Sequence, residues 1–268
     1  NNIIYCASSG GNIWKGSISN NVNGQNWVSL NDYMQIKGIT MLRYVNDINR
    51  ILIATGYNFY YTDNEGVTFE ISQGLDFLDD QDCGGCGIKR AVIREVDGAI
   101  FLLVDTQNID PWGRVGAIYK STNNGDTWSA ETTGATHNFT GIAAFGNKLF
   151  LTTANGTTAS QLIEFNGTST WSVRTTAQTS AGGLTGVWFV KNRLWITGND
   201  GTAEYIWEAS PFNKTWSGSD LADGDSIVEV EPTHEFTGII DGGAAVLASS
   251  TDGTVYSFKL TSGAFVNQ

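Results

Sequence analysis

Basic residues, proline and cysteine are all scarce in this sequence, and no hydrophobic stretch is long. Its 268 residues contain 15 Lys and Arg against 27 Asp and Glu, so the formal net charge is −12. Nucleic acids and anionic membrane surfaces attract proteins mainly through Lys and Arg. A membrane-spanning helix needs roughly 18 or more apolar residues in a row, and the sequence has no such run. We therefore expect no nucleic-acid partner and no insertion into a membrane.

Cysteine is limited to Cys6, Cys83 and Cys86, an odd number that gives no disulfide framework. The spacing of Cys83 and Cys86 leaves three interpretations open: a structural loop pair (reduced or bridged), part of a metal site, or a redox pair. A zinc site needs about four ligands, yet the only histidines are His137 and His234. A redox pair needs a helix N-terminus that lowers the thiol pKa, and no helix is predicted nearby. The sequence therefore favours the structural loop pair.

Glycine and aromatic residues, in contrast, are plentiful. Gly accounts for 32 residues and aromatic residues for 12%, while only 16% of the residues are charged. Short strands that pack through aromatic side chains and are joined by glycine turns have this composition. The expected fold class is therefore all-β.

Two segments align with each other without a gap, residues 62–69 (TDNEGVTF) and residues 121–128 (STNNGDTW). A short polar side chain at the Asn position can bond to nearby backbone amides and fix a hairpin. The Gly permits a positive φ, and the final aromatic residue can pack between sheets. The residues concerned are Asn64, Gly66, Thr68 and Phe69 in the first copy and Asn123, Gly125, Thr127 and Trp128 in the second.

Weaker copies recur along the whole chain at a spacing of roughly 42 to 59 residues. A second pattern, apolar-Thr-Gly-apolar, recurs at residues 139–142, 184–187 and 236–239, and an alternating strand follows each copy. Such repeats predict a six-bladed β-propeller with four-stranded antiparallel blades. The first blade begins at its second strand, so either residues 264–266 or residues upstream of Asn1 must supply the missing strand. The expected blades span approximately residues 1–35, 36–74, 86–133, 138–177, 183–220 and 235–268.

The two gapless segments resemble the Asp-box, or BNR repeat, of sialidases and related β-propellers, whose pattern is S-x-D-x-G-x-T-W. Asn64 and Asn123 stand where this family usually has Asp. The resemblance implies one propeller domain over residues 1–268, with the boxes on the face opposite the binding site. The usual Arg-Ile-Pro motif of sialidases is absent, and only Arg114 of the seven arginines falls clearly in an expected binding-face loop. The resemblance thus implies sialidase-like architecture without the sialidase catalytic motifs.

One long loop of the expected binding face carries candidate ligand-binding residues. Trp112 lies beside Asp110, Arg114 and Asn108. An aromatic platform flanked by polar hydrogen-bonding groups is typical of sugar binding, because the ring packs on apolar faces while polar neighbours bond to hydroxyls. The alternative is a Trp that folds back on its own loop.

A second long loop is acidic and includes Asp79, Asp80 and Asp82. Clustered carboxylates suit Ca²⁺, which takes six to eight oxygen ligands. The alternative is a solvated acidic loop without a metal. The expected cofactor is therefore either none or Ca²⁺.

The function that these observations favour is a non-catalytic recognition module that binds a glycan or a surface protein, with carbohydrate as the preferred ligand. One alternative is a glycoside hydrolase for neutral glycans, which needs a pair of carboxylates. A further alternative is a structural domain of a fibre, adhesin or virion appendage. The composition and the start at Asn1 suggest an extracellular, cell-surface or virion-surface protein, and a processed product or part of a longer chain. Candidate carboxylates for a hydrolase are Asp79, Asp105, Asp110, Asp200, Asp225 and Asp252.

Overall fold

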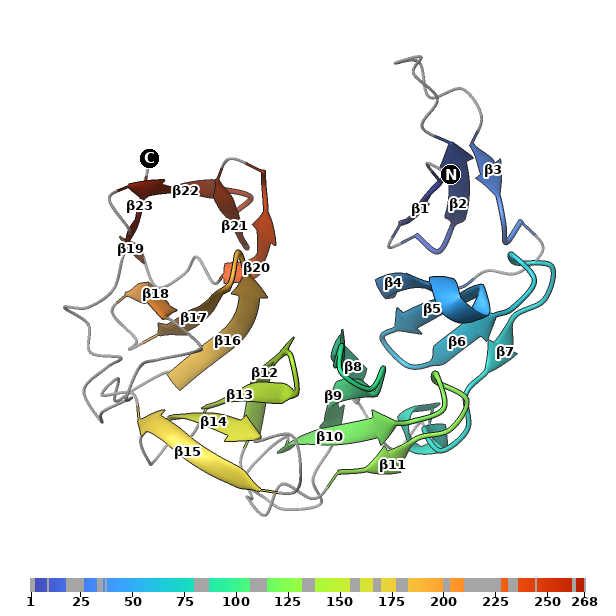
Figure 1. The fold of residues 1–268 in the computed structure, drawn as a ribbon, viewed down its shortest axis with the longest axis horizontal. Coiled ribbons are helices and arrows are strands. Elements are labelled where there is room, and N and C mark those ends of the chain that lie inside the picture. Colours follow the sequence, from blue (N-terminus) through green and yellow to red (C-terminus); the bar gives the residue numbers. More distant parts are fainter. Residues whose placement is uncertain are drawn as a thin grey trace. The chain divides into compact units, whose positions relative to one another are not determined.

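The computed structural model describes most of the chain as short antiparallel strands. Over the described residues the chain forms six antiparallel sheets and two short 3-10 helices (Figure 1), which confirms the all-β fold class. None of these residues forms a helix that is long and apolar enough to cross a membrane. The described residues are 3–8, 10–17, 27–32, 36, 38–79, 87–106, 115–131, 138–154, 160–165, 170–176, 183–199, 203–209, 228–230, 236–243, 245–261 and 264–267.

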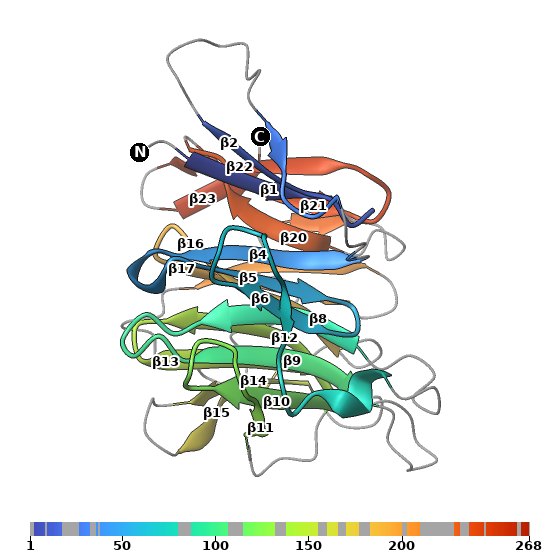
Figure 2. The same cartoon turned by 90° about the vertical axis from the view of Figure 1, so that its right-hand side faces the viewer.

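The chain divides into two compact units, Asn1–Ala91 with Gly98–Glu131, and Val92–Asp97 with Thr132–Gln268. The first unit holds three sheets, with strand orders β1-β2-β3, β4-β5-β6-β7 and β11-β10-β9-β8. Strands β4, β5 and β6 lie side by side in both views (Figures 1 and 2). The bounds are β1 Ile3–Ala7, β2 Ile13–Ser17, β3 Val28–Ser29, β4 Ile39–Val45, η1 Asn46–Ile48, β5 Arg50–Thr55, β6 Phe59–Thr62, β7 Glu70–Ile71, η2 Asp76–Asp79, β8 Gly87–Ile93, β9 Ile100–Thr106, β10 Val115–Ser121 and β11 Ser129–Ala130.

The second unit also holds three sheets, and each of them has four strands in chain order. Neighbouring strands are antiparallel throughout. The bounds are β12 Asn138–Phe145, β13 Lys148–Ala154, β14 Gln161–Phe165, β15 Trp171–Thr176, β16 Gly183–Val190, β17 Arg193–Asn199, β18 Glu204–Ala209, β19 Val228–Val230, β20 Phe236–Asp241, β21 Val246–Ser250, β22 Val255–Thr261 and β23 Ala264–Asn267.

The second strands of the sheets form much of the core. β5, β13 and β17 each begin with a half-buried basic residue, which is followed by five buried residues. A strand that is covered on both faces has a nearly continuous apolar sequence, whereas a strand covered on one face alternates. This burial explains why the sequences RILIAT, KLFLTT and RLWITG resemble one another.

The apolar-Thr-Gly-apolar pattern coincides with a β-bulge in the first strand of the sheet. The register shifts between Phe139 and Gly141, and again between Leu184 and Gly186, so that the intervening Thr140 and Thr185 have no partner residue on the next strand. The Thr140 hydroxyl donates to the carbonyl of Leu184 at 2.6 Å and so joins β12 to β16. A bulge of this kind aims the extra side chain sideways, here at the neighbouring sheet.

The glycine after the bulge allows the two sheets to approach closely. A Cβ atom on Gly141 would lie 2.6 Å from the backbone N of Val187 and 2.8 Å from the Cα of Gly186. Backbone atoms cannot swing aside as a side chain does, so this position has room for glycine alone. At the same position of another sheet, a Cβ atom on Gly238 would meet only the Ser249 hydroxyl, at 3.4 Å.

The first sheet has three strands, as expected from a first repeat that begins at its second strand. Of the two sources considered for the missing strand, the C-terminal segment is not used in that way. β23 pairs instead with β22 as the fourth strand of its own sheet, with Phe258 opposite Asn267 and Thr261 opposite Ala264. Only two residues separate these strands in the sequence, so the local pairing closes only a small loop and has a low entropic cost.

We predict that Gly141→Ala lowers the free energy of unfolding by about 2–3 kcal/mol, because the added methyl group overpacks a rigid contact. The matched variant Gly238→Ala changes it by less than about 0.5 kcal/mol. Urea unfolding of both variants measures the difference. Equal losses in the two variants would show that the close approach of β12 and β16 does not constrain the fold.

Candidate functional site

All four residues that the sequence predicts for ligand binding lie outside the described residues: Asn108, Asp110, Trp112 and Arg114. Asp80, Asp82, Cys83, Cys86, His137 and His234 also lie outside them. Asp79 ends η2, and its side chain is not among those described. Within the described part of the chain, no group of three or more His, Cys, Asp or Glu residues could hold a metal ion.

The strand ends nevertheless show where the predicted binding loop emerges. Residues 107–114 connect β9 to β10, and Val115 pairs with Thr106 at that end of the sheet. At its other end β10 reaches Ser121, where residues 121–128 form the turn into β11. We call the end of a sheet that carries this turn the turn end, and the opposite end the loop end. The predicted binding loop and the repeated turn are therefore at opposite ends of β10.

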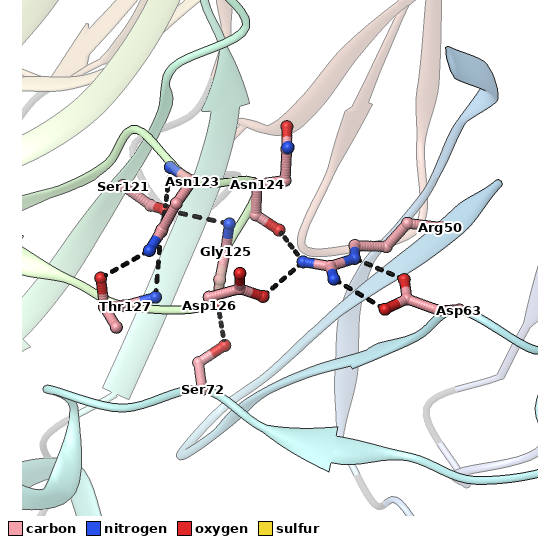
Figure 3. A network of polar contacts seen from close by, with 9 residues as sticks. All are labelled: Arg50, Asp63, Ser72, Ser121, Asn123, Asn124, Gly125, Asp126 and Thr127. Atoms are coloured by element: carbon pink, nitrogen blue, oxygen red, sulfur yellow. Dashed lines mark hydrogen bonds and ion pairs between the residues drawn. The ribbon is translucent and has the colours of Figure 1, made fainter. Parts of the chain in front are cut away.

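The turn at residues 121–128 is held by a closed circuit of short hydrogen bonds (Figure 3). Asn123 Oδ1 accepts from the Ser121 hydroxyl at 2.8 Å and from the Thr127 amide at 3.1 Å. Asn123 Nδ2 donates to the Thr127 hydroxyl at 2.8 Å. The amide of Gly125 donates to the Ser121 hydroxyl at 2.9 Å. The side chains of Ser121, Asn123 and Thr127 are thus paired with one another.

The turn at residues 62–69 has the same circuit. Asn64 Oδ1 accepts from the Thr62 hydroxyl and from the Thr68 amide, both at 2.9 Å. Asn64 Nδ2 donates to the Thr68 hydroxyl at 2.9 Å, and the Gly66 amide donates to the Thr62 hydroxyl at 2.9 Å. Gly66 and Gly125 have φ of 88° and 87°, a conformation that favours glycine.

The glycine and the aromatic residue of each turn contact the preceding sheet. A Cβ atom on Gly125 would lie 2.9 Å from the ring of Phe59, and one on Gly66 would lie 2.7 Å from Leu30. The Trp128 ring packs edge-on against Phe59 with their centroids 4.9 Å apart. Phe69 packs against a core cluster that includes Ile13 and Ile51. The repeated turn therefore both closes a hairpin and docks it on its neighbour.

Arg50 adds an electrostatic link between two turn ends (Figure 3). Its guanidinium donates two bonds to Asp63, at 2.6 and 2.7 Å. It also donates to Asp126 at 2.5 Å and to the carbonyl of Asn124 at 3.1 Å. The hydrogen bonds that Arg50 donates to Asp63 raise the pKa of Arg50 above its ordinary value, and the bond to Asp126 adds to the effect. Bidentate pairing fixes orientation as well as charge, so Arg50 sets the position of the 121–128 turn.

Segment 72–74 completes this contact. The Ser72 hydroxyl donates to the carbonyl of Gly125. Gln73 forms a parallel bridge with Thr127, through bonds from the Gln73 amide to Asp126 O at 2.9 Å and from the Trp128 amide to Gln73 O at 3.0 Å. Segment 72–74 therefore holds the 121–128 turn in place through hydrogen bonds.

A buried carboxylate that the sequence did not reveal lies in β14. Glu164 is 4% exposed and pairs with Lys148 at 2.8 Å and with Arg174 at 2.5 Å. Burial alone would raise the pKa of Glu164, but the hydrogen bonds from Arg174 and Lys148 lower it below the ordinary value of 4.5. The three residues come from β13, β14 and β15, so the ion pairs tie three adjacent strands together across one sheet face.

A second missed carboxylate, Glu204, is fully buried at the start of β18, where it is opposite Asn199 of β17. It accepts a hydrogen bond from the Thr185 hydroxyl at 3.0 Å, and Thr185 is 2.8 Å from the Thr197 hydroxyl. Thr185 is the bulged residue of β16, so the bulge delivers a hydroxyl to the buried acid. One signal in the sequence could have pointed to it, because an acidic residue begins a strand whose next three residues are apolar.

Two more groups of residues that the sequence analysis considered, a candidate carboxylate and the arginines, have structural roles. Asp252 accepts from the Ser250 hydroxyl and, at 2.9 Å, from the Thr254 amide, and so closes the turn between β21 and β22. This circuit resembles that of Asn123 with an Asp in place of the Asn. Four of the seven arginines pair with carboxylates of the described residues: Arg50, Arg94, Arg174 and Arg193.

Comparison with known proteins shows the fold alone. No protein-family model and no curated protein sequence matches the chain. Similar solved structures include YCF48 bound to a D1 peptide (TM-score 0.58, 13% identity, 100% of this chain and 77% of that one). The Dos1 propeller has a TM-score of 0.58 at 11% identity, over 100% of this chain and 67% of that one. The β-propeller domain of the trilobed protease from Pyrococcus furiosus has 0.54 at 12%, over 96% and 74%. The chain therefore has a β-propeller fold.

We predict that Asn123→Ala lowers the free energy of unfolding by about 1–2 kcal/mol, because two donors and the Thr127 hydroxyl lose their partner. Asn123→Asp should change it by less than about 0.5 kcal/mol, since a carboxylate can accept all three bonds, as Asp252 does in its own turn. Thermal unfolding of the two variants measures this contrast. A loss in Asn123→Asp as large as that in Asn123→Ala would contradict the circuit.

The lowered pKa of Glu164 predicts a pH dependence of stability. A carboxyl with a lowered pKa in the folded state stabilises the fold above its ordinary pKa of 4.5, and this contribution is lost as the pH falls through the folded value. Glu164→Gln should cost about 1–2 kcal/mol at pH 7, and the difference from wild type should shrink below pH 4.5.

Glu65→Gln is the matched control, because Glu65 is 46% exposed and pairs only at the surface with Lys15. It should cost less than about 0.5 kcal/mol at either pH. Urea unfolding at pH 7 and pH 3 supplies all the values. A Glu164→Gln deficit that stays constant with pH would refute the ion-pair account.

Proposed function

We propose that this chain is a six-bladed β-propeller of the Asp-box type that serves as a non-catalytic, extracellular recognition module, with carbohydrate as its ligand. The observation that carries the proposal is that the repeated structural turn and the long loop of candidate binding residues are at opposite ends of β10. The repeated turn is at one end of the strand, and residues 107–114 emerge at the other. Long loops on a rigid scaffold are where binding residues concentrate.

The assignment to the Asp-box type rests on the hydrogen-bond circuits of the two turns. In both turns, the Asn at the Asp position accepts one hydrogen bond from a hydroxyl group and one from a backbone amide. Asp252 makes the same kind of circuit with a carboxylate, so Asn is a suitable replacement for Asp in this role.

A non-catalytic role is supported by the engagement of the described charged groups. Glu164 is neutralised by two cations, and Arg50 by two carboxylates. A catalytic pair of carboxylates needs one acid and one base with separated pKa values across a cleft. Asp252, one of the six candidates, is committed to closing its own turn.

Carbohydrate is proposed because of the residue types between Thr106 and Val115. Trp112 with Asp110, Arg114 and Asn108 offers an aromatic face and both donors and acceptors. Calcium held by Asp79, Asp80 and Asp82 would belong to the connection from β7 to β8, residues 72–86, which includes η2.

We predict that Trp112→Ala weakens glycan capture by about 30-fold, the effect of removing an aromatic hot spot worth about 2 kcal/mol. The test is incubation with a defined glycan library, read by mass spectrometry for both capture and cleavage, with Ca²⁺ and with a chelator. The matched control is Trp27→Ala, which removes a Trp that is 45% exposed just before β3, at the turn end. Capture should be unchanged in this control.

Each outcome of that experiment has a meaning. Trimmed glycans would replace the proposal with a glycoside hydrolase. Equal capture by Trp112→Ala and wild type would remove Trp112 from the site. Absence of any capture would move the ligand from glycan to a protein surface, and a chelator effect would assign a role to calcium.

A further inference from the structure

Residues 55–58 form a tight turn between β5 and β6 that is held by the hydroxyl of its first residue. The Thr55 hydroxyl accepts from the amides of Tyr57 at 3.3 Å and Asn58 at 2.8 Å, and it donates to the carbonyl of Asn58 at 2.9 Å. The Thr55 amide donates to the same carbonyl at 2.8 Å. Thr55 is 4% exposed, so the turn is fixed from its buried side.

Two first strands anchor the same turn. The Gly56 amide donates to the carbonyl of Gly38, just before β4, at 3.2 Å, and the Ile88 amide of β8 donates to the carbonyl of Gly56 at 2.9 Å. A Cβ atom on Gly87 would lie 2.6 Å from the carbonyl oxygen of Gly56, so β8 lies directly against the turn. All of these residues belong to the first unit. The turn is therefore a rigid element, and a rigid element positions a ligand-contacting side chain more precisely than a free loop does.

The 55–58 turn lies at the loop end of its sheet. β6 runs from this turn to the 62–69 turn, which is at the turn end. β8 and β9 are neighbours joined by residues 94–99, so the start of β8 lies beside the end of β9. β9 ends at Thr106, where residues 107–114 leave the sheet. Through its bond to Ile88, the 55–58 turn is thus at the same end of the first unit as the predicted binding loop.

Tyr57 is the exposed aromatic residue of this turn. It is 58% exposed, and its side chain forms no hydrogen bond, ion pair or ring contact with any residue of the described part of the chain. Trp27, which is also exposed, covers Gly16 instead, where a Cβ atom would lie 2.6 Å from its ring. Other described tyrosines pack on rings, on a cation or on the core: Tyr5, Tyr44, Tyr60, Tyr61, Tyr205 and Tyr256.

A rigid, exposed aromatic ring of this kind suits a sugar. A pyranose has a face on which C–H groups predominate, and an aromatic ring packs on that face as on other apolar surface. Tyr makes such a contact at a low entropic cost, because only two side-chain angles have to be fixed. The turn is already ordered, which lowers the cost further. The net charge of −12 favours a neutral sugar over an anionic one.

We propose that Tyr57 contacts the ligand directly and packs on the C–H face of a neutral pyranose of the bound glycan. This inference rests on the carbohydrate-binding function proposed above. It adds to that function a binding residue in the described part of the first unit and a class of sugar, and it does not require Trp112 to be part of the site.

The test uses the whole chain and a defined library of neutral and sialylated oligosaccharides. The neutral oligosaccharide that wild type captures most tightly is titrated into each variant by calorimetry. Tyr57→Ala should raise its Kd about 10-fold, because the packing surface is removed. Tyr57→Phe should keep the Kd within about 2-fold of wild type, since the ring is retained.

The matched control is Trp27→Ala, which removes an exposed aromatic residue at the turn end and should leave the Kd unchanged. Thermal unfolding of Tyr57→Ala should match that of wild type, because the side chain has no packing partner to lose. A lower melting temperature of Tyr57→Ala together with a Kd as weak in Tyr57→Phe would assign Tyr57 to the structure of the turn and overturn the proposal.

Nitration with tetranitromethane reports on the ring itself, and mass spectrometry of peptides locates the modified tyrosines. Tyr57 should be nitrated readily in the free protein, and at an oligosaccharide concentration ten times the Kd its rate should fall about 10-fold. The rate at Tyr61, which lies under the Arg50 guanidinium near the turn end, should not change. A Tyr57 that resists nitration in the free protein is covered by another part of the chain, and that result would overturn the inference.

The remaining outcomes separate this inference from the proposed function. Capture of neutral oligosaccharides with equal Kd in wild type and Tyr57→Ala would remove Tyr57 from the site and leave the carbohydrate-binding function standing. Capture of sialylated members alone would overturn the neutral class. Absence of capture by wild type would remove the proposed function and this inference together.

Discussion

The burial of one strand on both faces is the constraint on which the rest of this structure depends. A four-stranded sheet cannot cover both faces of its own second strand, so β5, β13 and β17 require neighbouring sheets. Apolar burial is worth roughly 25 cal/mol per Å², and these strands are among the most completely buried segments of the chain. The sheets must therefore pack closely, and close packing explains the glycines at positions 141 and 125, where a side chain would strike the next sheet. The repeated pattern in the sequence follows from this requirement for close packing.

Polar groups must be satisfied at the same contacts, because an unpaired polar group in a dry interface costs about 1–3 kcal/mol. The chain meets this need with local circuits at the turns and with ion pairs between strands. Arg50 links two turns, and Glu164 links three strands. These charged side chains form structural ion pairs. This use of the turn end for structure is one reason why we propose the loop end as the binding face.

The features that the sequence could predict are the local ones. All partners of Asn64 lie between Thr62 and Thr68, so a short pattern contains the whole circuit. The all-β class followed from composition and repeats for the same reason. The pairing of β23 with β22 was less accessible, because the length of a strand does not show which edge it joins.

The features that escaped prediction join residues far apart in the chain. Arg50 and Asp126 are separated by 76 positions, and neither the charge of Arg50 nor its place at the start of a strand indicates its partner. Glu164 and Glu204 were hidden for a related reason. A carboxylate inside an apolar strand can be paired, as Glu164 is by Lys148 and Arg174, or hydrogen-bonded by a hydroxyl, as Glu204 is by Thr185. Only the fold brings those partners within reach.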